Sequence, residues 1–274
     1  MLRFMEPPGT CTNDIWTRLF DGSYGRPFIV DSGLKRALHF DLDAVQSEMD
    51  LRRPSRLCLA YTRKMMAFLL FNRSPKRILM LGLGGGSLAK FCYQHLPNSA
   101  CTAVEINDDV LALRDEFRVP ADDERFRVIR ADGVDYVGSL VAEKDVILAD
   151  ACDRAGTAPE LNALDFYQNA RRALAPGGVF VVNVCGNEHD RAAHLLRIHQ
   201  VFGDEHLVLP VRRDGNLVVL AFEGSRPRPS LAEINETAVD LKRSIGLDFP
   251  WYVRCIAIEQ QRRRAGFPFS EAGS

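Results

Sequence analysis

Four acidic residues in the middle of the chain each stand where a short strand-like run ends. They are Glu105, Asp132, Asp150 and Asp153. Short apolar runs bounded by turn residues are typical of buried strands, and ligands of open α/β sheets bind outside the carboxyl ends of such strands. We therefore expect the four carboxylates to converge on one crevice. The alternative is that they are ordinary polar loop residues without a ligand.

Asp150 and Asp153 are three residues apart across a turn, which allows both to face one point of reaction. Such a pair suits the transfer of a carbon group from a sulfonium to an amine. A free alkylamine has a pKa of about 10 and is almost all ammonium at neutral pH, so a site must hold the cation and remove its proton before attack. Two carboxylates can divide that work. Because a sulfonium is also cationic, an acidic pocket attracts both reactants.

A glycine-rich loop lies upstream of these acids, directly after the apolar residues 78–81. Its glycines are Gly82, Gly84, Gly85 and Gly86. Glycine permits a sharp turn and lets a ligand approach the backbone closely. The sequence predicts a strand before this loop and a helix over 87–95 after it. The free N–H groups at the start of that helix point back at the loop.

Glu105 follows the strand predicted at 101–104, about 20 residues after the loop, where an acid can accept hydrogen bonds from both hydroxyls of a ribose. The stretch from Arg77 to Glu105 therefore indicates a nucleoside-binding crevice, with a tight turn lacking any ligand as the alternative. A dinucleotide fingerprint would have Gly or Ala in place of Ser87, and the loop lacks the GK[ST] of triphosphate sites. Both differences favour an adenosyl sulfonium over NAD or ATP.

Strands alternate with helices along most of the chain, which predicts a mostly parallel sheet covered on both faces. The expected strands are 78–81, 101–104, 125–130, 145–149 and 179–184, followed by an antiparallel pair at 207–210 and 217–222. The expected helices are 61–71, 87–95, 107–117 with Asn107 as N-cap, 164–174 and 191–202. The fold class is thus α/β, a Rossmann-like doubly wound sheet.

We expect three regions. Residues 1–60 form an irregular start followed by a small β-hairpin, Phe28 to Phe40, around Asp31-Ser32-Gly33. Residues 61–223 form the nucleoside-binding catalytic domain. Residues 224–274 form a C-terminal helical extension with helical pieces at 230–245 and 252–264, after a linker rich in Pro, Gly and Arg.

Composition narrows the class of partner. The 274 residues are 46% hydrophobic and 26% charged, with a net charge of −1, which gives no footprint for nucleic acid or an acidic membrane. We expect a small-molecule partner. The sequence has no signal-peptide layout and no apolar stretch long enough for a bilayer, which predicts a soluble cytoplasmic protein.

Cysteine and histidine usage indicates neither disulfides nor a metal. The seven cysteines are scattered without a CxxC pair, which predicts reduced thiols. His189, His194 and His199 are five residues apart, a spacing that does not place them on one helix face, so no metal is expected.

The residues from Phe28 to Gly186 resemble the spermidine synthases, or polyamine aminopropyltransferases, and in particular their divergent spermidine-synthase-like bacterial branch. The features that carry the resemblance are the hairpin, Gln46, Tyr61, the LGLGGG loop, Glu105, Asp132-Gly133, the DxxD of Asp150 and Asp153, and LAPGGV at 174–179. The spacing from Gln46 to Tyr61 is longer than in the family.

The resemblance implies a class I S-adenosylmethionine methyltransferase-like fold, a homodimer and a role for each matching residue. Glu105 would hold the ribose, and Asp132, with Gly133 beside it, the adenine. Gln46 would flank the nucleoside. Asp150 would be the base, Asp153 would hold the amine, and Tyr61 would orient it.

Two departures from the family pattern bear on the substrates. The family loop reads GGGDG, and its Asp holds the ammonium tail of decarboxylated S-adenosylmethionine; this chain has Gly85 there. Backbone N–H groups at a helix N-terminus would instead favour the carboxylate of intact S-adenosylmethionine. Beyond Gly186, residues 216–222 replace the tyrosine- and proline-rich stretch that lines the polyamine pocket, so putrescine is not assured as the acceptor.

These observations lead to three hypotheses. The first is an alkyl-group transferase of the spermidine-synthase type, moving an aminopropyl group from decarboxylated S-adenosylmethionine to a polyamine-type amine. The second is an S-adenosylmethionine-dependent methyltransferase of a small molecule. The third is a nucleoside-binding homologue without catalysis, which the presence of both Asp150 and Asp153 disfavours.

Overall fold

One seven-stranded sheet forms the centre of the protein. The computed structural model describes residues 2–10, 12–42, 44–150, 152–153, 156–157, 159–211 and 215–265, with the backbone alone at 152–153, 156–157 and 159. The strand order is β12-β13-β11-β8-β5-β6-β7. The strands are β5 (Arg77–Leu81), β6 (Ala100–Glu105), β7 (Phe126–Arg130), β8 (Lys144–Ala149), β11 (Leu174–Val184), β12 (His206–Pro210) and β13 (Leu217–Phe222). β13 is antiparallel to both β11 and β12, and the other pairs are parallel.

The central strands are mostly apolar because both faces of the sheet are covered. In β5, Ile78 and Met80 belong to one apolar cluster, whereas Leu79 and Leu81 belong to a second cluster. Successive side chains of a strand point to opposite faces, so a strand buried on both sides has few polar positions. The predicted doubly wound α/β architecture is confirmed.

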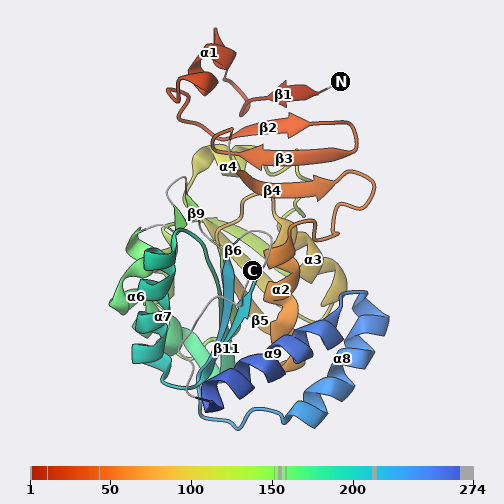
Figure 1. Cartoon of the computed structure of the whole chain (residues 1–274). Helices are drawn as coiled ribbons and strands as arrows, with labels where there is room; N and C mark the ends of the chain where they lie inside the picture. The colour runs from red at the N-terminus through yellow and green to blue at the C-terminus, as the bar shows by residue number, and fades with distance from the viewer. Residues whose placement is uncertain are drawn as a thin grey trace.

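Helices cover the two faces as separate layers (Figure 1). The first apolar cluster draws on α2 (Ala60–Met65), η1 (Met66–Leu70), α3 (Ser87–His95), α8 (Leu231–Ile245) and α9 (Phe249–Arg264). The second cluster draws on α5 (Gly133–Gly138), α6 (Leu164–Ala173) and α7 (Glu188–Phe202). The shorter elements α4 (Asp108–Ala112) and η2 (Pro159–Asn162) lie near strand ends. A two-stranded pair, β9 (Cys152–Asp153) with β10 (Gly156–Thr157), follows β8.

The N-terminal region is more ordered than expected. Besides the predicted hairpin of β2 (Phe28–Asp31) and β3 (Lys35–His39), it contains β1 (Arg3–Met5), α1 (Ile15–Phe20) and β4 (Val45–Asp50), and the four strands form one antiparallel sheet in chain order. The expectation of an irregular start was wrong because β1 has only three residues, too few to show a period. It is held by pairing with β2 and by the ring of Phe4, stacked 4.8 Å from that of Phe28.

Other elements also differ from the prediction. α4 ends at Ala112 instead of Phe117, because the chain then tightens into turns that end at Arg118, which has a φ of 52°. β11 begins at Leu174 and continues through the Pro-Gly-Gly segment, with a register shift before Val179. α5 was not predicted at all, since it has six residues with a glycine at each end.

The C-terminal helices pack beside α2 and η1 at the lower right of Figure 1. Ser230 and Glu233 form a capping box at the start of α8. Among the described residues, no helix is both long enough and apolar enough to cross a membrane.

Gly86 of the glycine loop is closely packed against Val119. Gly86 has a φ of 63°, and a Cβ at this position would lie 2.5 Å from Cγ2 of Val119. Gly246 is also left-handed, at 81°, but has nothing within 4 Å of such a Cβ. Gly246→Ala should therefore lower the free energy of unfolding by the backbone cost alone, about 1 kcal/mol. Gly86→Ala should lower it by roughly 1 kcal/mol more, because Val119 must move.

Urea unfolding of the two variants measures both losses. Adding Val119→Ala to Gly86→Ala should recover part of the second loss. Equal losses at the two glycines would show that Val119 does not restrict the loop.

Candidate active site

A cavity of about 1020 Å³ lies at the carboxyl ends of the parallel strands. Its walls come from the glycine loop, the ends of β6, β8 and β11, the strand β4, and the helix α2. The charged residues that line it are all acidic: Glu105, Asp132, Asp150 and Glu160. No Lys, Arg or His is among its described lining residues. The predicted crevice exists, and its charge favours cationic ligands.

Glu105 is fixed in place by the backbone around it. One carboxylate oxygen accepts the N–H of Leu83 in the glycine loop at 2.9 Å, and the other accepts the N–H of Asn107 at 2.9 Å. The side chain is only partly buried and lines the cavity. The carboxylate is therefore oriented before any ligand binds, with lone pairs left to accept from ligand hydroxyls.

Asp132 is the N-cap of α5. Its Oδ1 accepts the N–H of Val134 at 2.7 Å and that of Asp135 at 3.3 Å. Asp132 and Gly133 both line the cavity. Because the cap uses Oδ1, the second oxygen has capacity to accept from a ligand donor such as an amino group.

The carboxyl group of Asp150 is held by a chain of amides. Nδ2 of Asn183 on β11 donates to Oδ1 of Asp150 at 3.0 Å, and Nδ2 of Asn216 donates to Oδ1 of Asn183 at 3.0 Å. Asn183 is 3% exposed, so its amide is shielded from solvent. The hydroxyl of Tyr61 hydrogen-bonds to the Asp150 carboxyl and also lies 3.4 Å from the carbonyl of Gln46.

Burial raises the pKa of Asp150 from its ordinary range to about 6, although the hydrogen bonds from Asn183 and Tyr61 act in the opposite direction. Burial disfavours the charged carboxylate, whereas donors stabilise it. A carboxyl with a pKa near 6 is ionised at neutral pH yet accepts a proton more readily than an ordinary aspartate. That is the property required of a general base.

The other predicted site residues divide into three groups. Gln46, Tyr61, Gly82 and Gly84 line the cavity. Gly85 and Gly86 are not among its described lining residues; they pack against Ser47, Phe117 and Val119. The side chain of Asp153 lies outside the described residues, so its predicted position is not tested.

Several lining residues were missed by the sequence analysis. Asn183 and Asn216 approach Asp150 from β11 and from the start of β13, and Glu160 comes from η2. Ser47 lines the wall formed by β4. One signal was visible: Asn183 interrupts the apolar run VFVVNV, and a polar residue inside a buried strand needs a hydrogen-bond partner.

The expectation of reduced thiols was wrong at Cys185. This residue, directly after β11 at the cavity wall, is disulfide-bonded, while Cys58, Cys92, Cys101 and Cys255 are thiols outside any disulfide. Disulfide pairing depends on which distant segments the fold brings together, which scattered spacing does not reveal. In the described part of the chain, no group of three or more His, Cys, Asp or Glu residues could hold a metal ion.

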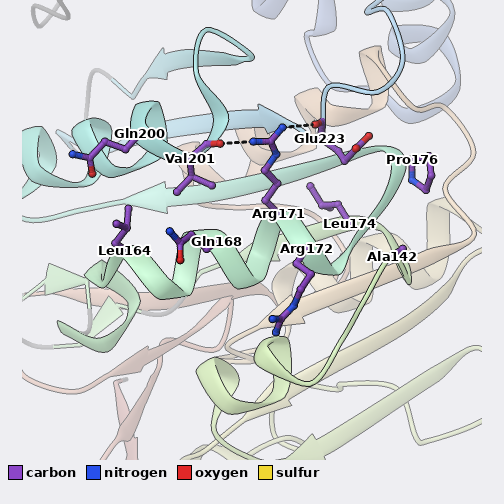
Figure 2. A pocket seen from close by; sticks show the side chains of 10 residues that line it. All are labelled: Ala142, Leu164, Gln168, Arg171, Arg172, Leu174, Pro176, Gln200, Val201 and Glu223. Atoms are coloured by element: carbon purple, nitrogen blue, oxygen red, sulfur yellow. Dashed lines mark hydrogen bonds between the residues drawn. The ribbon is translucent and has the colours of Figure 1, made fainter.

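A second hollow, of about 600 Å³, lies over α6 and α7 and is lined by no Asp and by one Glu, Glu223. Figure 2 shows Arg171 there, donating to the backbone carbonyls of Val201 and Glu223. Arg172 likewise donates to the carbonyl of Gly138. These guanidinium groups are engaged in holding loops together, so the acidic cavity is the better candidate for chemistry.

Comparison with known proteins agrees with this geometry. A family model described as the spermine/spermidine synthase domain matches residues 58–199. The chain is 38% identical to the polyamine aminopropyltransferase of Chromobacterium violaceum, over 82% of this chain and 87% of that protein.

Two solved structures show the same fold. The spermidine synthase of Thermotoga maritima is similar with a TM-score of 0.65 and 18% identity, covering 98% of this chain and 95% of that one. Human methyltransferase-like protein 13, in complex with SAH, is similar with a TM-score of 0.61 and 27% identity, covering 69% of this chain and 93% of that one. By the family match and the sequence identity, this chain belongs to the spermine/spermidine synthase family.

Proposed function

We propose that the protein is an aminopropyltransferase, which moves an aminopropyl group from decarboxylated S-adenosylmethionine to a polyamine-type amine. The observation that carries the proposal is the Asp150 carboxyl, with a pKa of about 6, in a cavity whose charged walls are all acidic. Both reactants are cations, and the cavity attracts cations. Family membership and the name of the Chromobacterium relative, polyamine aminopropyltransferase, support the same reaction.

The donor nucleoside would bind at the ends of β6 and β7. The oriented carboxylate of Glu105 would accept the ribose hydroxyls, and Asp132 would accept from the adenine amino group. Ile106 lines the cavity and is 60% exposed, so it offers an apolar surface to the base. Gln46 would flank the nucleoside from β4.

The amine would bind at the end of β8. Asp150 takes one proton from the ammonium, and the freed nitrogen lone pair attacks the carbon of the aminopropyl group that is bonded to sulfur. The carbon–nitrogen bond forms as the carbon–sulfur bond breaks. The electron pair of the carbon–sulfur bond stays on sulfur, so the nucleoside leaves as a neutral thioether. Asp153 would hold the amine substrate, and Tyr61, already hydrogen-bonded to Asp150, would orient it.

Methyl transfer from intact S-adenosylmethionine is the second candidate. The observation that favours it is Gly85, which supplies no carboxylate for the ammonium tail of a decarboxylated donor. The same attack geometry would then deliver a methyl group. Product analysis with each donor separates the two reactions.

We also propose, from the family likeness, that the protein is a cytoplasmic homodimer and divides into the regions 1–60, 61–223 and 224–274. Size-exclusion chromatography with light scattering tests the dimer. A monomer at micromolar concentration would contradict it.

Asp150→Asn should abolish transfer while leaving nucleoside binding intact. The amide keeps an oxygen for the Asn183 hydrogen bond but cannot accept the ammonium proton. Activity is measured with decarboxylated S-adenosylmethionine and a diamine, and binding by calorimetry with methylthioadenosine. We expect at least a thousandfold loss of kcat, in the range of a lost general base combined with a lost cation partner.

Unfolding is not an explanation for that loss. Asp150 holds its proton more tightly in the folded than in the unfolded chain, because its pKa is raised from 3.8 to about 6. Its ionisation therefore lowers the free energy of unfolding as the pH rises between these two values, and the loss is present in full at higher pH. Asp150→Asn should therefore be at least as stable as the wild type at pH 7.5. Unchanged turnover in a folded variant would exclude Asp150 as the base.

Asn183→Ala should move the acid limb of the pH–rate profile. In the wild type, kcat/KM should fall below about pH 6 as Asp150 takes up a proton. Loss of the Asn183 donor removes an interaction that lowers this pKa, so the limb should shift to higher pH. Asn216→Ala is the matched control: Asn183 can still donate to Asp150, so the shift should be smaller. An unmoved limb in Asn183→Ala would show that Asn183 does not set the ionisation of Asp150.

A further inference from the structure

The space beside Gly85 is already filled. A Cβ at this position would lie 2.6 Å from Oγ of Ser47 and 2.9 Å from Cδ1 of Phe117. Both distances are shorter than real Cβ atoms show, so this backbone has no room for an aspartate at position 85 unless its neighbours move. Ser47 of β4, 6% exposed, takes up part of that space.

Ser47 brings a second hydroxyl with it. Its Oγ lies 3.1 Å from Oγ of Ser87, the first residue of α3, and both serines line the cavity. Each hydroxyl both donates and accepts hydrogen bonds, and neither carries charge. The wall where the glycine loop meets β4 therefore offers a neutral polar pair.

The charge behind this wall is positive. Lys90 of α3 is 3% exposed, and its ammonium donates to the carbonyl of Gly85 at 2.8 Å and to that of Phe117 at 2.6 Å. Burial lowers the pKa of Lys90 to about 7, so a large fraction is charged near neutrality. The carboxylate of Glu105 is already engaged by backbone N–H groups, that of Leu83 in the loop and that of Asn107 after β6.

We propose that the Ser47–Ser87 hydroxyl pair receives the three-carbon tail of the donor, and that it admits a tail with a carboxylate as readily as a tail without one. A neutral pair with a cation behind it has no electrostatic preference for the ammonium-only tail. Intact S-adenosylmethionine therefore competes with its decarboxylated form for this cavity. This inference rests on the proposed function and specifies how its donor is selected.

Calorimetric titration of the wild type with each donor tests the inference directly. We expect the two dissociation constants to agree within tenfold. A decarboxylated donor bound more than tenfold tighter, or intact S-adenosylmethionine bound more than tenfold tighter, would overturn it. Turnover of the decarboxylated donor with a diamine is measured on the same preparation, so that failure of the proposed activity is recognised separately.

Single substitutions of the two serines test whether they contact the donor tail. Ser47→Ala and Ser87→Ala should each weaken both donors by roughly three- to tenfold, the effect of one lost hydrogen bond. Methylthioadenosine has no charged tail and should bind as before. Equal weakening of methylthioadenosine would indicate a general distortion of the loop and would contradict the assignment.

A designed pair of substitutions should create a preference for the decarboxylated donor. Ser47→Gly combined with Gly85→Asp removes the Ser47 contact and supplies a carboxylate, while the ring of Phe117, 2.9 Å from the new Cβ, must still shift. The double variant should prefer the decarboxylated donor by more than tenfold. Gly85→Asp alone, with Ser47 still present, is the matched control and should unfold at a lower temperature than the double variant. If the double variant kept the wild-type ratio, position 85 would not face the donor tail.

Discussion

The position of Asp150 depends on the register of three parallel strands. Ala149, the last residue of β8, is paired with Leu81 of β5 on one side and Val182 of β11 on the other. The backbone N–H of Asp150 then donates to the carbonyl of Leu81 at 2.9 Å, and Asn183, next on β11, reaches its carboxyl group. A slip of one residue would turn Asp150 to the opposite face of the sheet. The apolar packing of the strands thus determines the position of the Asp150 carboxyl group, the proposed base.

Two other acids of the cavity hold the surrounding backbone. Glu105 joins the glycine loop to the start of α4 through Leu83 and Asn107, and Asp132 caps α5. Because these bonds orient the carboxylates in the free protein, little ordering would be left for the binding of the proposed nucleoside. Replacing either acid also removes these bonds, so weaker nucleoside binding in such a variant would report the change in the loop or the helix as well as the lost ligand contact.

How much of this site the sequence predicts depends on how far apart along the chain the interacting residues lie. The glycine loop, Glu105 and Asp132 are local features: each is set by a strand end and the few residues after it, and all three were predicted as site positions. The helix α5 that Asp132 caps was not predicted. Asn216 reaches Asn183 only because β13 returns antiparallel to β11, with Leu217 paired with Val184. That register is a property of the assembled sheet and leaves no mark in the spacing of residues.

The glycine loop shows the same limit in a different form. Gly85 was recognised as a missing carboxylate, but the sequence does not show what stands in its place, because Ser47 is 38 positions away on another sheet. Lys90, buried behind the loop, adds a positive charge there. Its ammonium engages the carbonyl of Gly85, so this oxygen is turned toward the buried cation and contributes little to holding a ligand ammonium. The absence of a carboxylate at position 85 and the engagement of the Gly85 carbonyl by Lys90 thus have the same effect. Both leave the loop with fewer acceptors for a ligand ammonium. The cavity is acidic where the amine and the sulfonium would react, and it is neutral where the tail of the donor would end.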